Sequence, residues 1–284
     1  MSSIAFVTTC KKRLHHIRQT LPLIVAQGPD EIIFVDYGCP EASGDWVEAN
    51  HPGVKVVRVT DDPGFCLARA RNTGAAQARS EWLVMIDGDI LTTPGWGDWM
   101  RGHLAPGHFY RSEHVDGKRD PESYGTMICR SADFAAIGGY DQVFQGWGGE
   151  DDDLYYRLVG RGLTQAHYPA RFVSAIRHGH EERAGWGGMR NQEEKALLNH
   201  CYMTAKMQAT AANGGGPLPL DVRRDLMDGT RRALTQWFDD GADKPLPIRY
   251  VLARTSQFTL SGRNHIESEL AITVNVRRDN PPPP

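Results

Sequence analysis

Cysteine is scarce in this sequence, and the residues present are not arranged in pairs. The five cysteines are odd in number, scattered, and form no CxxC motif: Cys10, Cys39, Cys66, Cys129 and Cys201. This pattern argues against a disulfide framework and against a zinc site built from thiolates. It favours reduced thiols, so we expect an intracellular, cytoplasmic protein.

Long apolar runs and an excess of one charge are also missing. No stretch approaches the roughly 18 consecutive apolar residues that a membrane-spanning helix needs. The first apolar stretch, in MSSIAFVTTC, is too short for the core of a signal peptide, and no basic residue precedes it. The net charge of −3 gives no electrostatic reason to bind nucleic acid or an anionic membrane. We therefore expect no transmembrane segment and no nucleic-acid partner.

Three common catalytic motifs are absent as well. The sequence contains no GxSxG nucleophile elbow, no P-loop and no GxGxxG dinucleotide-binding turn. Serine hydrolysis, P-loop nucleotide hydrolysis and nicotinamide redox chemistry therefore each lack their usual sequence marker.

Strand and helix patterns alternate through the first ninety residues. Short apolar runs predict strands at residues 3–9, 31–36, 55–60 and 82–87. The stretches between them predict helices at residues 13–26, 46–50 and 68–78. This alternation predicts an α/β fold with a parallel, doubly wound sheet. Ligands of such sheets bind beyond the carboxyl ends of the strands, where Thr9, Asp36 and Asp87 fall.

The rest of the chain is less regular. We expect strands at residues 107–111, 124–129, 172–178, 248–259 and 270–277. We expect helices at residues 152–162, 191–212 and 221–239. The stretch NGGGPLP at 213–219 predicts a linker. The natural division is a catalytic domain over residues 1–200 and a C-terminal extension of helices and a β-hairpin over residues 201–284.

The stretch GWGGEDDDL at residues 146–154 concentrates acidic side chains beside a Trp and three glycines. Neighbouring carboxylates repel one another, so such a cluster suggests a use for the charge. Glycine allows a ligand to approach the backbone, and a Trp offers a flat face for a sugar ring. The ordinary alternative is a solvated first turn of the helix that follows, where acidic residues are favourable.

Two shorter motifs could bind a cation. Asp87-Gly88-Asp89 follows an apolar strand directly, and carboxylate oxygens suit Mg²⁺ or Mn²⁺. An acidic turn without function is the alternative. His178 and His180 would share one face if the strand at 172–178 extends that far. Either imidazole could be a metal ligand, although a structural histidine is the more common case.

The stretch FCLARARNTG at residues 65–74 places basic residues behind an aromatic one. Arg69 and Arg71 could meet phosphate or acidic groups. An ordinary basic surface helix remains the alternative.

Together these motifs resemble a known family. GWGGEDDDL, with GGYD at 138–141 before it and YYRL at 155–158 after it, closely resembles the signature of the β-1,4-galactosyltransferases. The DGD and FCLARARNTG stretches support the resemblance by their order and spacing. It extends over about residues 3–183 and implies the GT-A fold of nucleotide-sugar transferases, with family 2-like and polypeptide GalNAc-transferase relatives.

The resemblance implies a metal site and a base. Asp89 looks like the DxD residue that binds Mn²⁺, with Mg²⁺ as the other candidate, and Asp87 like the residue nearer the ribose. His178 looks like the second protein ligand of the metal. The family often has Met three residues before that His, whereas this chain has Ala175, which cannot coordinate. Asp151 matches the catalytic base.

The remaining roles concern donor and acceptor. Glu150 and Asp152 match residues that bind the acceptor or orient the base. Trp147 looks like the residue that packs on the donor and acceptor sugars. The other implied donor-binding positions are Thr9, Arg13, Asp36, Phe65 and Arg69, the last in place of a family Arg that is Leu67 here. The loop 181–192 is expected to close over the donor.

The implied function is metal-dependent, inverting transfer of a hexose, galactose or N-acetylgalactosamine, from a UDP-sugar to an acceptor hydroxyl. A retaining GalNAc-transferase-like enzyme is one alternative, although that group resembles WGGEN where this chain has Asp151. A nucleotide-sugar-binding module without catalysis is the other. The acceptor stays open among glycan, peptide, lipid-linked sugar and small molecule.

Overall fold

A computed structural model describes most of the chain. The described residues are 2–118, 120–144, 146, 148–177, 192–241, 246–255 and 266–274. They form two compact units, the first made of Met1–Gln142 and Glu150–Gly188, the second of Val143–Gly149 and Met189–Pro284. Each unit is described by itself below.

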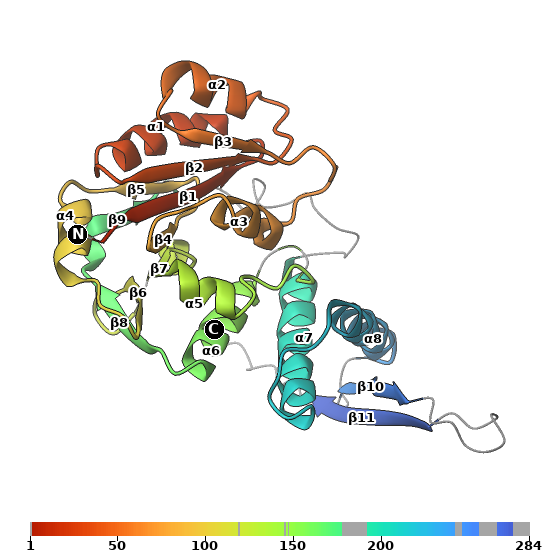
Figure 1. Ribbon diagram of the computed structural model, residues 1–284. Coiled ribbons are helices and arrows are strands. Elements are labelled where there is room, and N and C mark those ends of the chain that lie inside the picture. The colour runs from red at the N-terminus through yellow and green to blue at the C-terminus, as the bar shows by residue number, and fades with distance from the viewer. Residues whose placement is uncertain are drawn as a thin grey trace, which may run out of the picture. The chain divides into compact units, whose positions relative to one another are not determined.

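The first unit is built on a seven-stranded sheet (Figure 1). In spatial order its strands are β3 (Lys55–Arg58), β2 (Glu31–Asp36), β1 (Ile4–Cys10), β4 (Trp82–Met85), β7 (Met127–Arg130), β6 (His108–Ser112) and β8 (Thr164–Tyr168). The first four strands are parallel, as the alternating pattern predicts. β7 runs antiparallel to both β4 and β6, and β8 runs parallel to β6.

Helices cover both faces of this sheet. One face carries α1 (Leu14–Val25), α2 (Ser43–Asn50) and α4 (Trp96–His103), and the other carries α3 (Leu67–Ala75), α5 (Ser131–Ala136) and α6 (Glu150–Gly160). All seven residues of β1 are buried. Phe6 packs into the core on the first face and Val7 into the core on the second, because successive side chains of a strand point to opposite faces. The predicted α/β fold is confirmed.

A small two-stranded sheet lies outside the main one. It pairs β5 (Ile90–Thr92) with β9 (Val173–Ala175) in antiparallel orientation, and two short 3₁₀ turns, η1 (Pro121–Ser123) and η2 (Ala170–Phe172), complete the unit. The predicted strand at 172–178 was therefore too long. Its pairing ends at Ala175, after which the Ile176 N–H donates to the Asp89 carbonyl at 2.8 Å.

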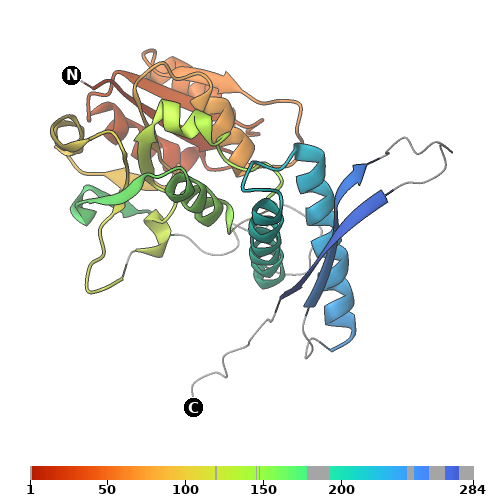
Figure 2. The ribbon, with the colours of Figure 1, turned by 60° about the horizontal axis from the view of Figure 1, so that its bottom comes forward.

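The second unit contains α7 (Gln192–Ala212), α8 (Leu220–Asp239) and a hairpin of β10 (Leu246–Thr255) and β11 (Ile266–Val274) (Figure 2). Val143 and Phe144 belong to its apolar core, with Leu198, Cys201 and Tyr202 of α7. The expected boundary at residue 200 falls inside α7, because this helix is continuous and packs as one piece. None of the helices in the described ranges is long and apolar enough to cross a membrane.

Gly74 sets how closely α3 approaches the sheet. A Cβ at this position would lie 2.4 Å from Val7 Cγ1 and 2.9 Å from Val35 Cγ2. We expect Gly74→Ala to lower the free energy of unfolding by about 1–3 kcal/mol through overpacking, measured by urea denaturation. Gly160→Ala is the matched control, because a Cβ there meets nothing within 4 Å. Equal stability of the two variants would show that the helix moves away at no cost.

Candidate functional site

The carboxyl ends of three parallel strands meet at one edge of the sheet. Cys10 at the end of β1 is paired with Asp36 at the end of β2, and Val7 of β1 is paired with Met85 of β4. Asp87 follows β4 and therefore lies close to the end of β1. The fold thus brings the predicted ligand-binding edge and the DGD motif together.

A buried arginine joins the DGD motif to the acidic motif. Arg71 of α3 donates from Nη2 to Asp87 Oδ1 at 2.7 Å and from Nη1 to Asp151 Oδ1 at 2.8 Å. Its side chain is only 3% exposed. The carboxylates are far apart in sequence, so the tertiary fold is what gathers them around one cation.

The second residue of the DGD motif also meets a basic side chain. Asp89 Oδ2 lies 3.1 Å from Nη1 of Arg13, the residue that precedes α1. Asp87 Oδ1 is occupied by Arg71, but 28% of the Asp87 side chain is exposed. Within the described ranges, no three His, Cys, Asp or Glu side chains are grouped as a metal site. Two carboxylates with accessible oxygen are a partial donor set of the kind that Mg²⁺ and Mn²⁺ accept.

Glu150 and Asp151 open α6 in a buried environment. Burial, together with the neighbouring Asp151 carboxylate, raises the pKa of Glu150 from 4.5 to about 8. Burial also raises the pKa of Asp151 above its ordinary value, against the opposing effect of the Arg71 cation. Glu150 Oε2 finds no hydrogen-bond partner in the described part of the chain. Two adjacent carboxyl groups thus differ in character, one protonated at neutral pH and one paired with a cation.

The next two acidic residues are already engaged. The Tyr124 hydroxyl donates a short hydrogen bond to Asp152. Asp153 accepts from Arg157 at 2.8 Å, one helical turn away. Arg157 also donates to the Ile137 carbonyl at 2.8 Å, so this ion pair fixes the helix to the preceding loop. Asp153 is therefore structural, whereas Asp152 lies beside the predicted base.

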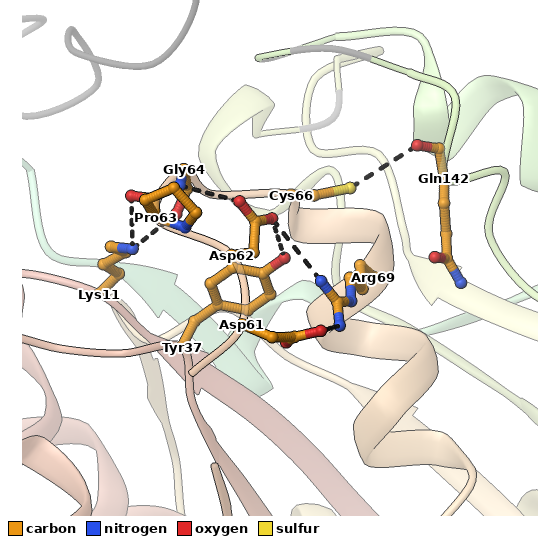
Figure 3. Close-up of polar contacts among 9 residues, drawn as sticks. All are labelled: Lys11, Tyr37, Asp61, Asp62, Pro63, Gly64, Cys66, Arg69 and Gln142. Carbon is orange, nitrogen blue, oxygen red and sulfur yellow. Dashed lines mark hydrogen bonds and ion pairs between the residues drawn. The ribbon is translucent and has the colours of Figure 1, made fainter. Parts of the chain in front are cut away.

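A compact loop borders the ends of β1 and β2 (Figure 3). Lys11 Nζ donates to the Gly64 carbonyl at 2.6 Å, and the Tyr37 hydroxyl donates to Asp62 at 2.5 Å. Phe65 meets Tyr37 edge to face, with 5.3 Å between ring centroids. This loop supplies aromatic surface beside the strand ends.

Arg69 does not point to the acidic cluster. It pairs with Asp61 at 2.7 Å, at an exposed position (Figure 3). Arg71 is the residue that reaches the site. It shares the buried face of α3 with Ala68 and Gly74, at a spacing of three residues. An arginine on the small-residue face of a helix is the sequence signal that could have singled it out, because a buried guanidinium needs anionic partners.

Asp36 and Thr9, two further residues predicted to bind the donor, differ in their hydrogen bonds. Asp36 accepts from the Cys39 N–H at 2.7 Å and from the Gly44 N–H at 2.9 Å. One carboxylate oxygen thus holds the loop before α2 and the other holds the first turn of α2, which leaves less capacity for a nucleotide. The buried Thr9 hydroxyl has no hydrogen-bond partner among the residues that the structure describes. Trp147, His178 and the loop 181–191 lie outside those residues.

Two family models match the chain side by side. The model for glycosyl transferase family 2 matches residues 5–104, and the model for the N-terminal domain of galactosyltransferase matches residues 107–181. The first match contains the DGD motif and Arg71. The second contains the acidic motif. Both halves of the site therefore lie within matched sequence.

Characterised relatives include three transferases. Validoxylamine A glucosyltransferase of Streptomyces hygroscopicus subsp. jinggangensis is 54% identical over 188 residues, which cover 47% of this chain and 44% of that protein. Pre-mycofactocin glycosyltransferase of Mycobacterium tuberculosis is 27% identical over 183 residues, covering 52% and 37%. Human β-1,4-galactosyltransferase 1 is 27% identical over 125 residues, covering 39% and 30%. The chain thus spans less than half the length of each relative.

Solved structures share the fold at low sequence identity. S. aureus TarS 1–349 in complex with UDP-GlcNAc superposes with a TM-score of 0.57 at 13% identity, covering 85% of this chain and 76% of that one. GalNAc-T7 with UDP, GalNAc and Mn²⁺ gives a TM-score of 0.56 at 16% identity, covering 87% and 59%. Fold and family matches together identify residues 5–181 as a glycosyltransferase domain of the GT-A fold that resembles the β-1,4-galactosyltransferases.

Proposed function

We propose that this chain is a metal-dependent, inverting glycosyltransferase that moves a hexose from a UDP-sugar to an acceptor hydroxyl. The observation that carries the proposal is the bridge from Asp87 through Arg71 to Asp151. It holds a donor-side carboxylate and a candidate base on the two terminal nitrogens of one buried guanidinium. Such closeness is required when a base must act on a hydroxyl next to a bound nucleotide sugar.

Asp151 is the proton acceptor in this mechanism. The acceptor oxygen forms a bond to the anomeric carbon while the bond from that carbon to the diphosphate breaks. The hydroxyl proton passes to the Asp151 carboxylate, and the nucleoside diphosphate leaves with the bonding electrons. Burial raises the pKa of Asp151, and the Arg71 cation, 2.8 Å away, opposes that rise and favours the carboxylate form. Glu150, protonated at neutral pH, has a hydroxyl to donate to an acceptor oxygen.

The DGD carboxylates would hold the divalent cation. Asp89 and Asp87 offer oxygen ligands that suit Mn²⁺ or Mg²⁺, and His178 is the proposed nitrogen ligand. Ile176, two residues before His178 in sequence, is hydrogen-bonded to the Asp89 carbonyl at 2.8 Å. Arg13, 3.1 Å from Asp89, adds positive charge on the same side. When bound, the cation would act as a Lewis acid on the leaving diphosphate.

The donor sugar is a hexose, with UDP-galactose and UDP-N-acetylgalactosamine as first candidates from the resemblance to galactosyltransferases. The Streptomyces relative is named a glucosyltransferase, so UDP-glucose belongs in the same comparison. The test is UDP release from a panel of UDP-sugars, with Mn²⁺ and with EDTA, without added acceptor. Metal-dependent release from one preferred sugar would support the proposal. Absence of both release and Mn²⁺-dependent UDP binding would refute it.

Asp151→Asn should lower the transfer rate by about 100-fold or more, because the variant lacks the proton acceptor. UDP binding in the presence of Mn²⁺ should change little, since the carboxylate is not on the nucleotide side. The rate is followed by UDP release and the affinity by calorimetry. Transfer at the parent rate would disprove the assignment of the base.

Asp89→Asn should weaken UDP binding about tenfold or more when Mn²⁺ is present, because a charged oxygen ligand of the cation is lost. The control is the same titration in EDTA, where parent and variant should bind UDP equally. An equal loss in both titrations would mean that Asp89 contacts the nucleotide instead.

Glu150→Gln should become more stable relative to the parent as pH rises from about 5 to about 9. The pKa of Glu150 is about 8 in the folded chain and near 4.5 when unfolded, so its favourable contribution is complete below 4.5. That contribution is lost as pH rises to about 8, whereas Gln does not ionise. Melting temperatures across the pH range measure the difference. A constant difference would argue that Glu150 is ionised throughout.

A further inference from the structure

The guanidinium of Arg71 has two carboxylate partners from different parts of the chain. Each terminal nitrogen serves one of them, Asp87 at 2.7 Å and Asp151 at 2.8 Å. A guanidinium is planar and rigid, so two carboxylates bound to separate nitrogens are held at a fixed spacing. A lysine ammonium offers a single point charge without such a fork.

The backbone at Gly125 passes close to this group. A Cβ built on Gly125 would lie 2.7 Å from Arg71 Nη2, 3.0 Å from Asp151 Oδ2 and 3.2 Å from Asp87 Oδ2. All three groups therefore converge over a backbone that carries no side chain. Any side chain at residue 125 would clash with Arg71, Asp87 and Asp151, which together are called the triad below.

The ring of Tyr140 covers the guanidinium of Arg71. Its ring centroid lies 4.9 Å from the guanidinium carbon of Arg71, a cation–π distance. Asn72, the neighbour of Arg71 on α3, donates to the Tyr140 carbonyl and accepts from the Tyr140 N–H, both at 2.8 Å. One turn of α3 thus fixes both the cation and the ring that covers it.

We propose that Arg71 is a positioning residue that sets the orientation of Asp151 relative to the donor-side carboxylate Asp87. The inference rests on the proposed function, in which Asp151 is the base. Arg71 acts through Asp151 and need not contact either substrate. The alternative roles are direct binding of the donor phosphates and simple neutralisation of buried charge.

Arg71→Lys separates these roles, because it keeps the positive charge and removes the pair of terminal nitrogens that holds the two carboxylates. Positioning predicts that kcat for UDP release falls by about 100-fold, the cost of a small misplacement of a reacting group. It also predicts that the affinity for UDP with Mn²⁺ stays within about threefold of the parent. A parent-like kcat, or a loss confined to KM and UDP affinity, would overturn the proposal.

Arg161→Lys is the matched control. Arg161 lies just beyond α6 and makes an exposed ion pair with Asp133 at 3.2 Å. The same chemical change there should leave kcat and KM unaltered. A comparable loss in this variant would show that the effect of Arg71→Lys is a general response of the protein to lost ion pairs.

Gly125→Ala tests the geometry without changing any charge. The added methyl displaces the triad, so kcat should fall while UDP affinity is retained and the thermal melt shows a folded protein. If Arg71→Lys does not fold, this variant carries the test. Unchanged kcat in a folded Gly125→Ala protein would contradict the positioning role.

A stability cycle keeps the inference distinct from the proposed function. Melting temperatures are compared for Asp87→Asn, Asp151→Asn and the double variant. Residues that share one buried cation should show shifts that do not add, whereas independent sites add. If the parent neither releases UDP from any sugar nor binds UDP in a Mn²⁺-dependent way, the proposed function fails but this cycle still tests the bridge. Additive shifts would overturn the inference.

Discussion

The structure of the candidate site depends on a buried cation between two carboxylates. Asp87 follows strand β4 and Asp151 lies in the first turn of helix α6. Both carboxylates accept hydrogen bonds from Arg71. Burying an unpaired guanidinium or an unpaired carboxylate would be costly, so each group needs the others in place. The ion bridge therefore ties the folding of the sheet edge to the placement of the acidic motif.

The same cation gives the neighbouring residues Glu150 and Asp151 different surroundings. Glu150 and Asp151 share a helix turn and a buried environment, yet only Asp151 touches the cation. Burial raises the pKa of both carboxyl groups, to about 8 for Glu150, and the Arg71 cation opposes the rise at Asp151. Contact with one arginine thus gives two like residues, side by side on α6, different electrostatic surroundings.

Many of the helices and strands could be predicted from the sequence because they depend on local patterns of apolar residues. Thr9, Asp36 and Asp87 lie at the ends of strands that are apolar runs. Such runs are easy to recognise in a sequence because the strands are buried on both faces. The strands expected at 107–111 and 124–129 are β6 and β7, which pair with each other, while β7 also pairs with β4, more distant in sequence. The strand expected at 172–178 proved shorter, because its pairing partner β5 has only three residues.

The α/β fold, the DGD and acidic motifs and their family resemblance follow from the sequence alone, since each depends on contiguous stretches whose chemistry is local. Which arginine contacts the acidic residues depends on the three-dimensional packing. Arg69 and Arg71 are two residues apart on one helix, and helical geometry turns one outward to Asp61 and the other inward to Asp87 and Asp151. In the fold, Asp36 also accepts from a backbone amide of the following loop and from one in the first turn of α2. Such choices depend on which distant groups share a buried space, and that is a property of packing.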